Sequence, residues 1–171
     1  MLPDAPSICR LHLDFMKWAD EKMFSLVQTL SPEVCNQPNG VSFESLAGTV
    51  QHIYRGERIW YRRVAGEASV QLSDVETPTL DEIAGLWPQL HEDWRRWAAE
   101  LDANQWFQSI LSKNSHGVES RLPYWQIVLH LVNHGSYHRG QVMSLVRQSG
   151  AQPVATDLIA YYRVLASKTN S

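Results

Sequence analysis

Two histidines interrupt an apolar pattern between residues 127 and 148. The pattern alternates between spacings of four and three residues, as on the inward face of a bundled helix, and consists of Ile127, Leu131, His134, His138, Gln141, Leu145 and Gln148. Residues four apart share a helix face, with Cβ atoms roughly 5–6 Å apart, so the rings of His134 and His138 can reach one point. Burying one unpartnered polar ring costs on the order of 1–3 kcal/mol. A shared metal ion explains the pair, and a hydrogen-bonded pair bridged by water is the alternative.

A third histidine, His130, stands one turn earlier in the same segment. His130 and His138 lie roughly 12 Å apart along a helix axis, so the three rings cannot all bind one ion. His134 and His138 are centred on the apolar face, whereas His130 lies at its edge, and the later pair is therefore favoured. Gly135 and Gly140 flank that pair at a cost of roughly 0.5–1 kcal/mol each, which predicts that another backbone or a ligand approaches there.

The third ligand of a metal site would come from another helix, and His52 is the candidate. Taken alone, His52 is an ordinary helix histidine more often than a ligand. Three imidazoles would leave a fourth position for water, which is typical of catalytic sites. Imidazole suits zinc best, and nickel, iron and copper remain open. By spacing alone, the side chains that could hold the second ring nitrogens are Gln141, Asn133 and Glu57.

Glu57 is itself a candidate catalytic base, because it lies on the apolar stripe of its segment. The structural alternative is a buried acid paired with Arg58 or Arg62. Next to His138, Tyr137 and Arg139 could orient an anionic substrate, or could face solvent or another helix.

The elements that must position these residues are four amphipathic helices. Apolar spacing predicts them over about residues 7–30, 42–65 and 79–101 and from 123 to 148, joined in a four-helix bundle. Residues 105–122 predict a short β-hairpin with its turn at 114–117, and Thr156 opens a short C-terminal helix. His91 stands among charged residues and is interpreted as part of a solvated face with no chemistry. The fold class is all-α, in a single domain over residues 1–171.

Composition limits the function classes. The chain has 171 residues, 44% hydrophobic and 19% charged, as in a globular protein. A net charge of −3 without a basic run argues against nucleic acid as a partner. No stretch is long and apolar enough for a membrane span or a secretory signal, and Cys9 and Cys35 stand isolated. A cytoplasmic location is therefore expected.

Four stretches together resemble the DinB family of metalloenzymes. They are LDFMKWADEKM at 13–23, FESLAGTVQHIYRGERIWYRR at 43–63, HLVNHGSYHRGQ at 130–141 and QPVATDLIAYYR at 152–163. The resemblance covers nearly the whole chain in order, and the HRGQ ending after the histidine pair is its most specific part. It implies a four-helix bundle, commonly dimeric, whose metal is bound by His52, His134 and His138.

The resemblance also frames the expected function. It implies a metal-dependent enzyme in which the ion activates a thiol or a water against a small electrophile, as a thiol S-transferase or a hydrolase. The expected partners are a small-molecule substrate, a low-molecular-weight thiol and a second copy of the chain. The alternative is a non-catalytic metal-binding or stress-responsive dimer whose ion stabilises the bundle.

Overall fold

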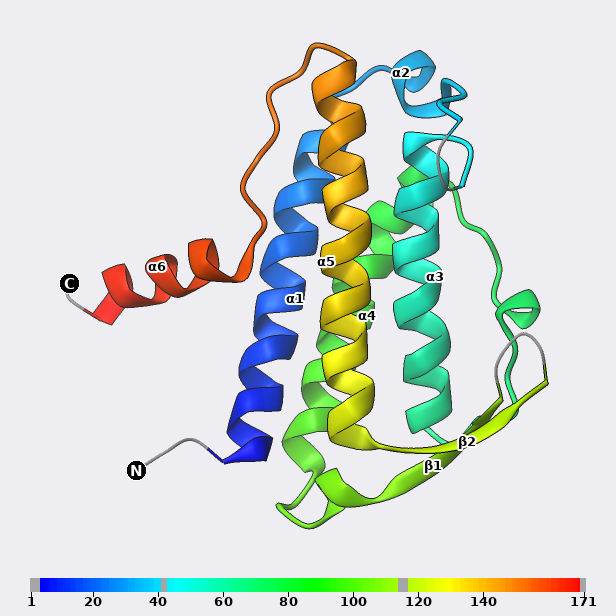
Figure 1. Ribbon diagram of the computed structural model, residues 1–171, viewed down its shortest axis with the longest axis vertical. Helices are drawn as coiled ribbons and strands as arrows, with labels where there is room; N and C mark the ends of the chain where they lie inside the picture. Colours follow the sequence, from blue (N-terminus) through cyan, green and yellow to red (C-terminus); the bar gives the residue numbers. More distant parts are fainter. Residues whose placement is uncertain (1–3, 41–42, 114–116, 170–171) are drawn as a thin grey trace.

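The computed structural model is a bundle of four long helices with a hairpin across one end (Figure 1). It describes residues 4–40, 43–113 and 117–169. The elements are α1 (Ala5–Val27), α2 (Pro32–Asn36), α3 (Leu46–Val64), α4 (Leu80–Glu100), β1 (Ser109–Lys113), β2 (Glu119–Pro123), α5 (Tyr124–Gln148) and α6 (Leu158–Thr169). Single-turn helices lie over Leu72–Asp74 and Gln105–Phe107. The four-helix bundle with a small hairpin and a short last helix is confirmed.

The direction of the helices follows from residues 65–79, which run back along the bundle (Figure 1). Gln51 in the first turns of α3 donates to the carbonyl of Pro78, so α3 and α4 begin at the same end. At the other end, Arg10 near the start of α1 donates to the carbonyls of Ala98 and Leu101 at the end of α4. α3 and α4 are therefore parallel. α5 packs against both α1 and α3, and α4 packs against the same two helices from the opposite face of the bundle (Figure 1).

Local sequence signals set most helix boundaries. The Thr79 hydroxyl accepts the amide of Glu82, whose carboxylate accepts the amide of Thr79, which is the capping box predicted for α4. Ser45 caps α3 by accepting the amide of Gly48, so this helix begins at Leu46 and not near Ser42. The short helix α2 falls in a segment that the sequence predicted only as a connection.

The inward face of α5 differs from the predicted one. Ile127 and Leu131 are buried as expected, but His134 and Gln141 are half-buried and Gln148 is exposed. A second row, Val128, Val132, Val142 and Val146, is buried as well. Because both rows are apolar, the centre of the buried arc moves round the helix, and the imidazoles fall at its edge.

β1 and β2 pair antiparallel, with Ile110 opposite Leu122. Arg63 at the end of α3 holds this hairpin, because its guanidinium donates to the Ser112 hydroxyl and to the carbonyls of Val70 and Lys113. The predicted turn at 114–117 lies mostly outside the described residues.

Cys9 and Cys35 are both free and buried. Among the described helices, none combines the length and apolar character needed to cross a lipid bilayer.

Candidate metal centre

Three imidazoles meet between α3 and α5. His52 comes from α3, and His134 and His138 come from successive turns of α5. One ring nitrogen from each lies within 4.8 Å of the others, and the Nε2 atoms of His52 and His134 are 2.9 Å apart. The structure thus brings together the three residues that the resemblance implied, and this set can hold a divalent cation.

Burial keeps two of these rings neutral. It lowers the pKa of His52 to about 4 and that of His134 to about 3, and the neighbouring imidazoles add to both shifts. At neutral pH the rings of His52 and His134 therefore each have one nitrogen with a free lone pair. Metal ions bind this neutral form of histidine, so the protonation state fits the proposed ligand set.

The orientation of His138 is fixed by Gln141, one turn later on α5. The Nδ1 of His138 lies 2.7 Å from the side-chain oxygen Oε1 of Gln141, and because this oxygen can only accept, Nδ1 is the donor. Nε2 is then the ring nitrogen left to bind an ion, as expected of a metal ligand with a supporting hydrogen bond. Of the three supporting residues predicted, Gln141 is in place, whereas Asn133 is exposed and Glu57 lies elsewhere.

Two glycines of α3 make room for the site. A Cβ at Gly56 would lie 3.0 Å from Cε1 of His134, so a side chain there would push against the ring. A Cβ at Gly48 would collide with the carbonyl oxygen of Phe43, whose φ of 63° is in the left-handed region. The Phe43 ring stacks on His52 with the centroids 3.8 Å apart. These contacts hold the His52 and His134 rings from the side of α3.

The glycines predicted to mark a close approach on α5 behave differently. At Gly135, a Cβ would lie 2.6 Å from Nη1 of Arg139, so the space serves a side chain of the same helix. At Gly140, a Cβ would meet no atom within 4 Å. The expectation of a neighbouring backbone at these two positions was therefore wrong.

His130 stands apart from the three histidines. Its ring packs edge-on against Trp60, with centroids 5.5 Å apart, and lies 5.7 Å from the His134 ring. The preference for the later histidine pair on α5 agrees with this arrangement.

A second titratable cluster lies in the bundle centre, and each long helix contributes one residue to it: Asp20 (α1), Glu57 (α3), His91 (α4) and Arg139 (α5). Arg139 donates to Oδ1 of Asp20 at 2.7 Å. The Nε2 of His91 is 3.5 Å from Oδ2 of Asp20 and 3.5 Å from Oε2 of Glu57. All four side chains are buried.

This cluster corrects two interpretations of the sequence. His91 is only 4% exposed, so it does not belong to the solvated face formed by its charged neighbours. Glu57 accepts a hydrogen bond from the Trp87 indole at 2.8 Å and does not pair with Arg58 or Arg62. One signal of this buried cluster was present in the sequence: Asp20 stands on the apolar stripe of α1, between Met16 and Met23.

The close contacts in the central cluster shift the pKa values of its titratable groups. Burial and the charge of Asp20 raise the pKa of Glu57 to about 7. Burial lowers the pKa of His91, but the nearby carboxylates of Asp20 and Glu57 outweigh burial and raise the pKa to about 9. For Asp20, burial is outweighed by Arg139 and His91, so its pKa is lowered.

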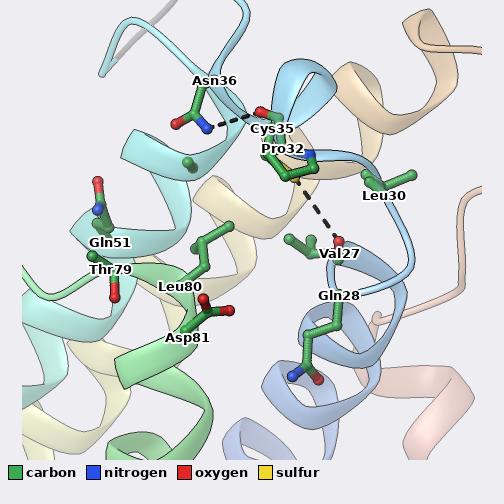
Figure 2. A pocket seen from close by; sticks show the side chains of 11 residues that line it. Val27, Gln28, Leu30, Pro32, Cys35, Asn36, Gln51, Thr79, Leu80 and Asp81 are labelled. Atoms are coloured by element: carbon green, nitrogen blue, oxygen red, sulfur yellow. Dashed lines mark hydrogen bonds between the residues drawn. The ribbon is translucent and has the colours of Figure 1, made fainter.

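A cavity of about 380 Å³ lies at the end of the bundle where α3 and α4 begin (Figure 2). Its wall includes Gln28, Gln51 and Asp81, and the thiol of Cys35 donates toward the carbonyl of Val27 beside it. Gln51 faces this cavity, while His52, one step round α3, faces α5. The three histidines therefore lie on another side of α3.

Comparison with known proteins gives one family. The model of the DinB family matches residues 8–168. Protein DinB of Bacillus subtilis strain 168 is 23% identical over 86% of this chain and 90% of its own length. The crystal structure of a DinB-like protein from Bacillus cereus ATCC 10987 has the same fold, with a TM-score of 0.64 at 18% identity, over 84% of this chain and 94% of that one.

Proposed function

This chain belongs to the DinB family, and from that membership and its three converging imidazoles we propose that it is a metal-dependent enzyme acting on a small electrophile. The proposed ligands are His52, His134 and His138. Zinc is the proposed ion, with nickel or iron as alternatives. Such an ion lowers the pKa of a bound water or thiol and polarises a carbonyl group. The proposed reaction is transfer of a low-molecular-weight thiol to the substrate, or hydrolysis of the substrate.

The observation that carries this proposal is the donor set itself. Three imidazole rings from two helices present nitrogens within 4.8 Å of one another, and two of the rings are only half-buried. Three protein ligands at a partly exposed point leave coordination positions open to a small molecule, whereas structural zinc sites are usually closed by four protein ligands.

Neighbouring side chains would shape the substrate's surroundings. Phe43 packs against both His52 and His138, and its ring shields these imidazoles from solvent on one side. Tyr137 contacts the His138 ring edge-on and is 64% exposed, so its hydroxyl is available to orient a bound molecule. Arg139 is not available for this role, because its guanidinium is buried against Asp20. We assign the proposed chemistry to the histidines, since the Glu57 carboxylate points into the central cluster.

A second copy of the chain is the other proposed partner. α6 packs beside α1 at the edge of the bundle (Figure 1), and Ile159 and Tyr162 on it are exposed apolar residues. A homodimer that covers them should sediment at twice the chain mass of 19.5 kDa. Sedimentation as a monomer at micromolar concentration would reject this part of the proposal.

Metal analysis of single variants tests the proposed ligands. Purified protein is saturated with zinc, dialysed and analysed for bound metal. We expect His52→Ala, His134→Ala and His138→Ala each to bind one equivalent less than the wild type, because two remaining imidazoles hold zinc weakly. His12→Ala is the matched control: His12 is a histidine of α1 that bonds to the carbonyl of Ile8 and should leave the metal content unchanged.

Turnover separates the enzyme from the non-catalytic alternative. The metal-loaded protein is assayed with cysteine or glutathione and monobromobimane for thiol transfer, and with para-nitrophenyl acetate for hydrolysis. We expect one of these activities to depend on bound metal and to be lost in His138→Ala. If neither reaction is accelerated and chelation unfolds the protein, the ion has the structural role and the enzymatic proposal fails.

A further inference from the structure

The central cluster has polar atoms that the fold leaves without hydrogen bonds. They are Oδ2 of Asp20, Oε1 of Glu57, both ring nitrogens of His91 and Nε of Arg139, in side chains with 0%, 1%, 2% and 0% of their surface exposed. An unpaired buried polar group costs roughly 1–3 kcal/mol, so several in one place call for a physical explanation. The nearest carboxylate oxygens to His91 face it from two other helices.

The separations in this cluster match coordination better than hydrogen bonding. A good N–H···O bond spans about 2.7–3.2 Å, whereas Nε2 of His91 is 3.5 Å from both Oδ2 of Asp20 and Oε2 of Glu57. Ligands bound at roughly 2.0–2.2 Å to a tetrahedral ion lie about 3.4 Å from one another. One donor atom from each residue lies within 4.8 Å of the other two.

Outer contacts hold both carboxylates in place. Arg139 donates to Oδ1 of Asp20 and leaves Oδ2 directed toward His91. The Trp87 indole donates to Oε2 of Glu57 at 2.8 Å and leaves Oε1 without a partner. The Trp87 ring stacks against His91 with centroids 5.8 Å apart. Metal-binding carboxylates are commonly supported by such hydrogen bonds from a second layer of residues.

A cavity leads to the cluster from between α1 and α4. It has a volume of about 140 Å³ and is lined by Asp20, Trp87 and His91 together with Phe24 and Pro88. A cation with one or two water molecules fits this volume, since a water occupies about 30 Å³ in the liquid. The cluster is thus buried and yet reachable by a small ion.

We propose that Asp20, Glu57 and His91 form a second divalent-cation site, separate from the three histidines. Two carboxylates balance the charge of a divalent ion, and the positive charge of Arg139 favours a small anion such as hydroxide as a further ligand. Oxygen and imidazole together suit zinc, manganese or ferrous iron. This inference does not depend on the function proposed for the histidine site.

The competing explanation is an ion network without metal. With His91 protonated, the charges of Asp20, Glu57, His91 and Arg139 cancel, and no cation is needed. The two explanations differ in one measurable quantity, the number of ions bound when the three-histidine site is removed.

The test therefore uses the double variant His134→Ala/His138→Ala, which leaves the central cluster intact. After saturation with zinc and dialysis, we expect two equivalents in the wild type and one in the double variant. Circular dichroism establishes that the double variant is folded. A folded double variant that retains no zinc overturns the second site and leaves the histidine site unaffected.

Substitutions in the cluster then locate the remaining ion. Added to the double variant, His91→Gln should remove the last equivalent, and Glu57→Gln should weaken its binding at least tenfold in a chelator competition. Glu57→Gln keeps the shape of the side chain and its hydrogen bond to Trp87. It therefore replaces His91→Gln as the test if the His91→Gln chain does not fold. Glu92→Gln is the matched control and should retain one equivalent, because this side chain is 42% exposed on α4 and pairs with Arg95. Retention of full zinc binding in a folded His91→Gln or Glu57→Gln chain overturns the proposal.

Discussion

The three histidines and the central cluster contain similar donor groups at different depths. His52 and His134 are half-buried between two helices, and burial keeps these rings uncharged. Asp20, Glu57, His91 and Arg139 are enclosed by four helices and offset one another's charges. The same physical factor, removal from water, therefore yields neutral imidazoles at one place and charged side chains at the other, because only the second place contains carboxylates.

The difference also separates two roles in the fold. A half-exposed imidazole can lose its neighbours at small cost, since water replaces the lost contacts. A buried charge that loses its partner keeps the whole desolvation penalty. The central cluster should therefore dominate stability, and the histidine site should dominate ligand binding.

Removal of Asp20 should give the largest effect on stability. Asp20→Ala leaves the Arg139 guanidinium buried without its carboxylate, and we expect the free energy of unfolding to fall by about 3–5 kcal/mol. His52→Ala should cost only about 1 kcal/mol in metal-free protein. Urea denaturation in the presence of a chelator measures both. Equal losses would show that the two regions do not differ in this way.

The pH dependence of stability should have opposite signs for the two regions. The pKa of His91 is raised from 6.5 to about 9, so its contribution is complete below pH 6.5 and is lost as the pH rises through 9. The pKa of Glu57, raised to about 7, acts in the same direction. We expect an alkaline loss on the order of 2 kcal/mol in chelated protein. In His91→Gln this loss should be reduced to the part that Glu57 contributes.

On the acid side the histidine site should act instead. The pKa of His52 is lowered to about 4, so the unfolded chain takes up the proton more readily and stability falls as the pH drops from 6.5 toward 4. His52→Ala should reduce this acid loss and leave the alkaline one. If the alkaline loss disappears in His52→Ala and is undiminished in His91→Gln, the assignment of the two pH ranges is wrong.

Gly56→Ala should give the smallest effect, with opposite consequences for stability and binding. Alanine stabilises a helix interior by about 0.5–1 kcal/mol relative to glycine. At position 56 the new Cβ would press on the His134 ring, so this gain should be reduced and zinc affinity should fall several-fold. Gly85→Ala in α4 is the control: its Cβ meets no atom within 4 Å, so stability should rise while zinc affinity stays the same. Unchanged zinc affinity in Gly56→Ala would contradict the proposed contact.

Sequence reasoning succeeded where the signal was local. The capping box at Thr79 and Glu82, the helical stripes and the hairpin each depend on residues close in the chain. His134 and His138 were found because they are four apart on one helix. The assignment of His52 as the third ligand needed the family resemblance, since a single histidine on another helix carries no spacing signal.

The central cluster could not be found in the same way. Each long helix contributes one residue, and the contacts depend on which helices are neighbours and in which direction they run. Glu57 stood out as an acid on an apolar stripe, but its partners His91 and Trp87 lie on α4. The charged residues next to His91 suggested a solvated face, although Trp87, Leu90 and His91 itself turn toward the core.

α5 contributes residues to both regions, and this has a consequence for synthesis. His134 follows His52 by 82 residues, and a ribosome adding about 5–20 residues per second needs about 4–16 s to cover that distance. During this interval the nascent chain carries His52, Asp20 and Glu57 without the histidines and the arginine that complete their surroundings. The proposed three-histidine site can therefore bind a metal only after the last long helix has been translated.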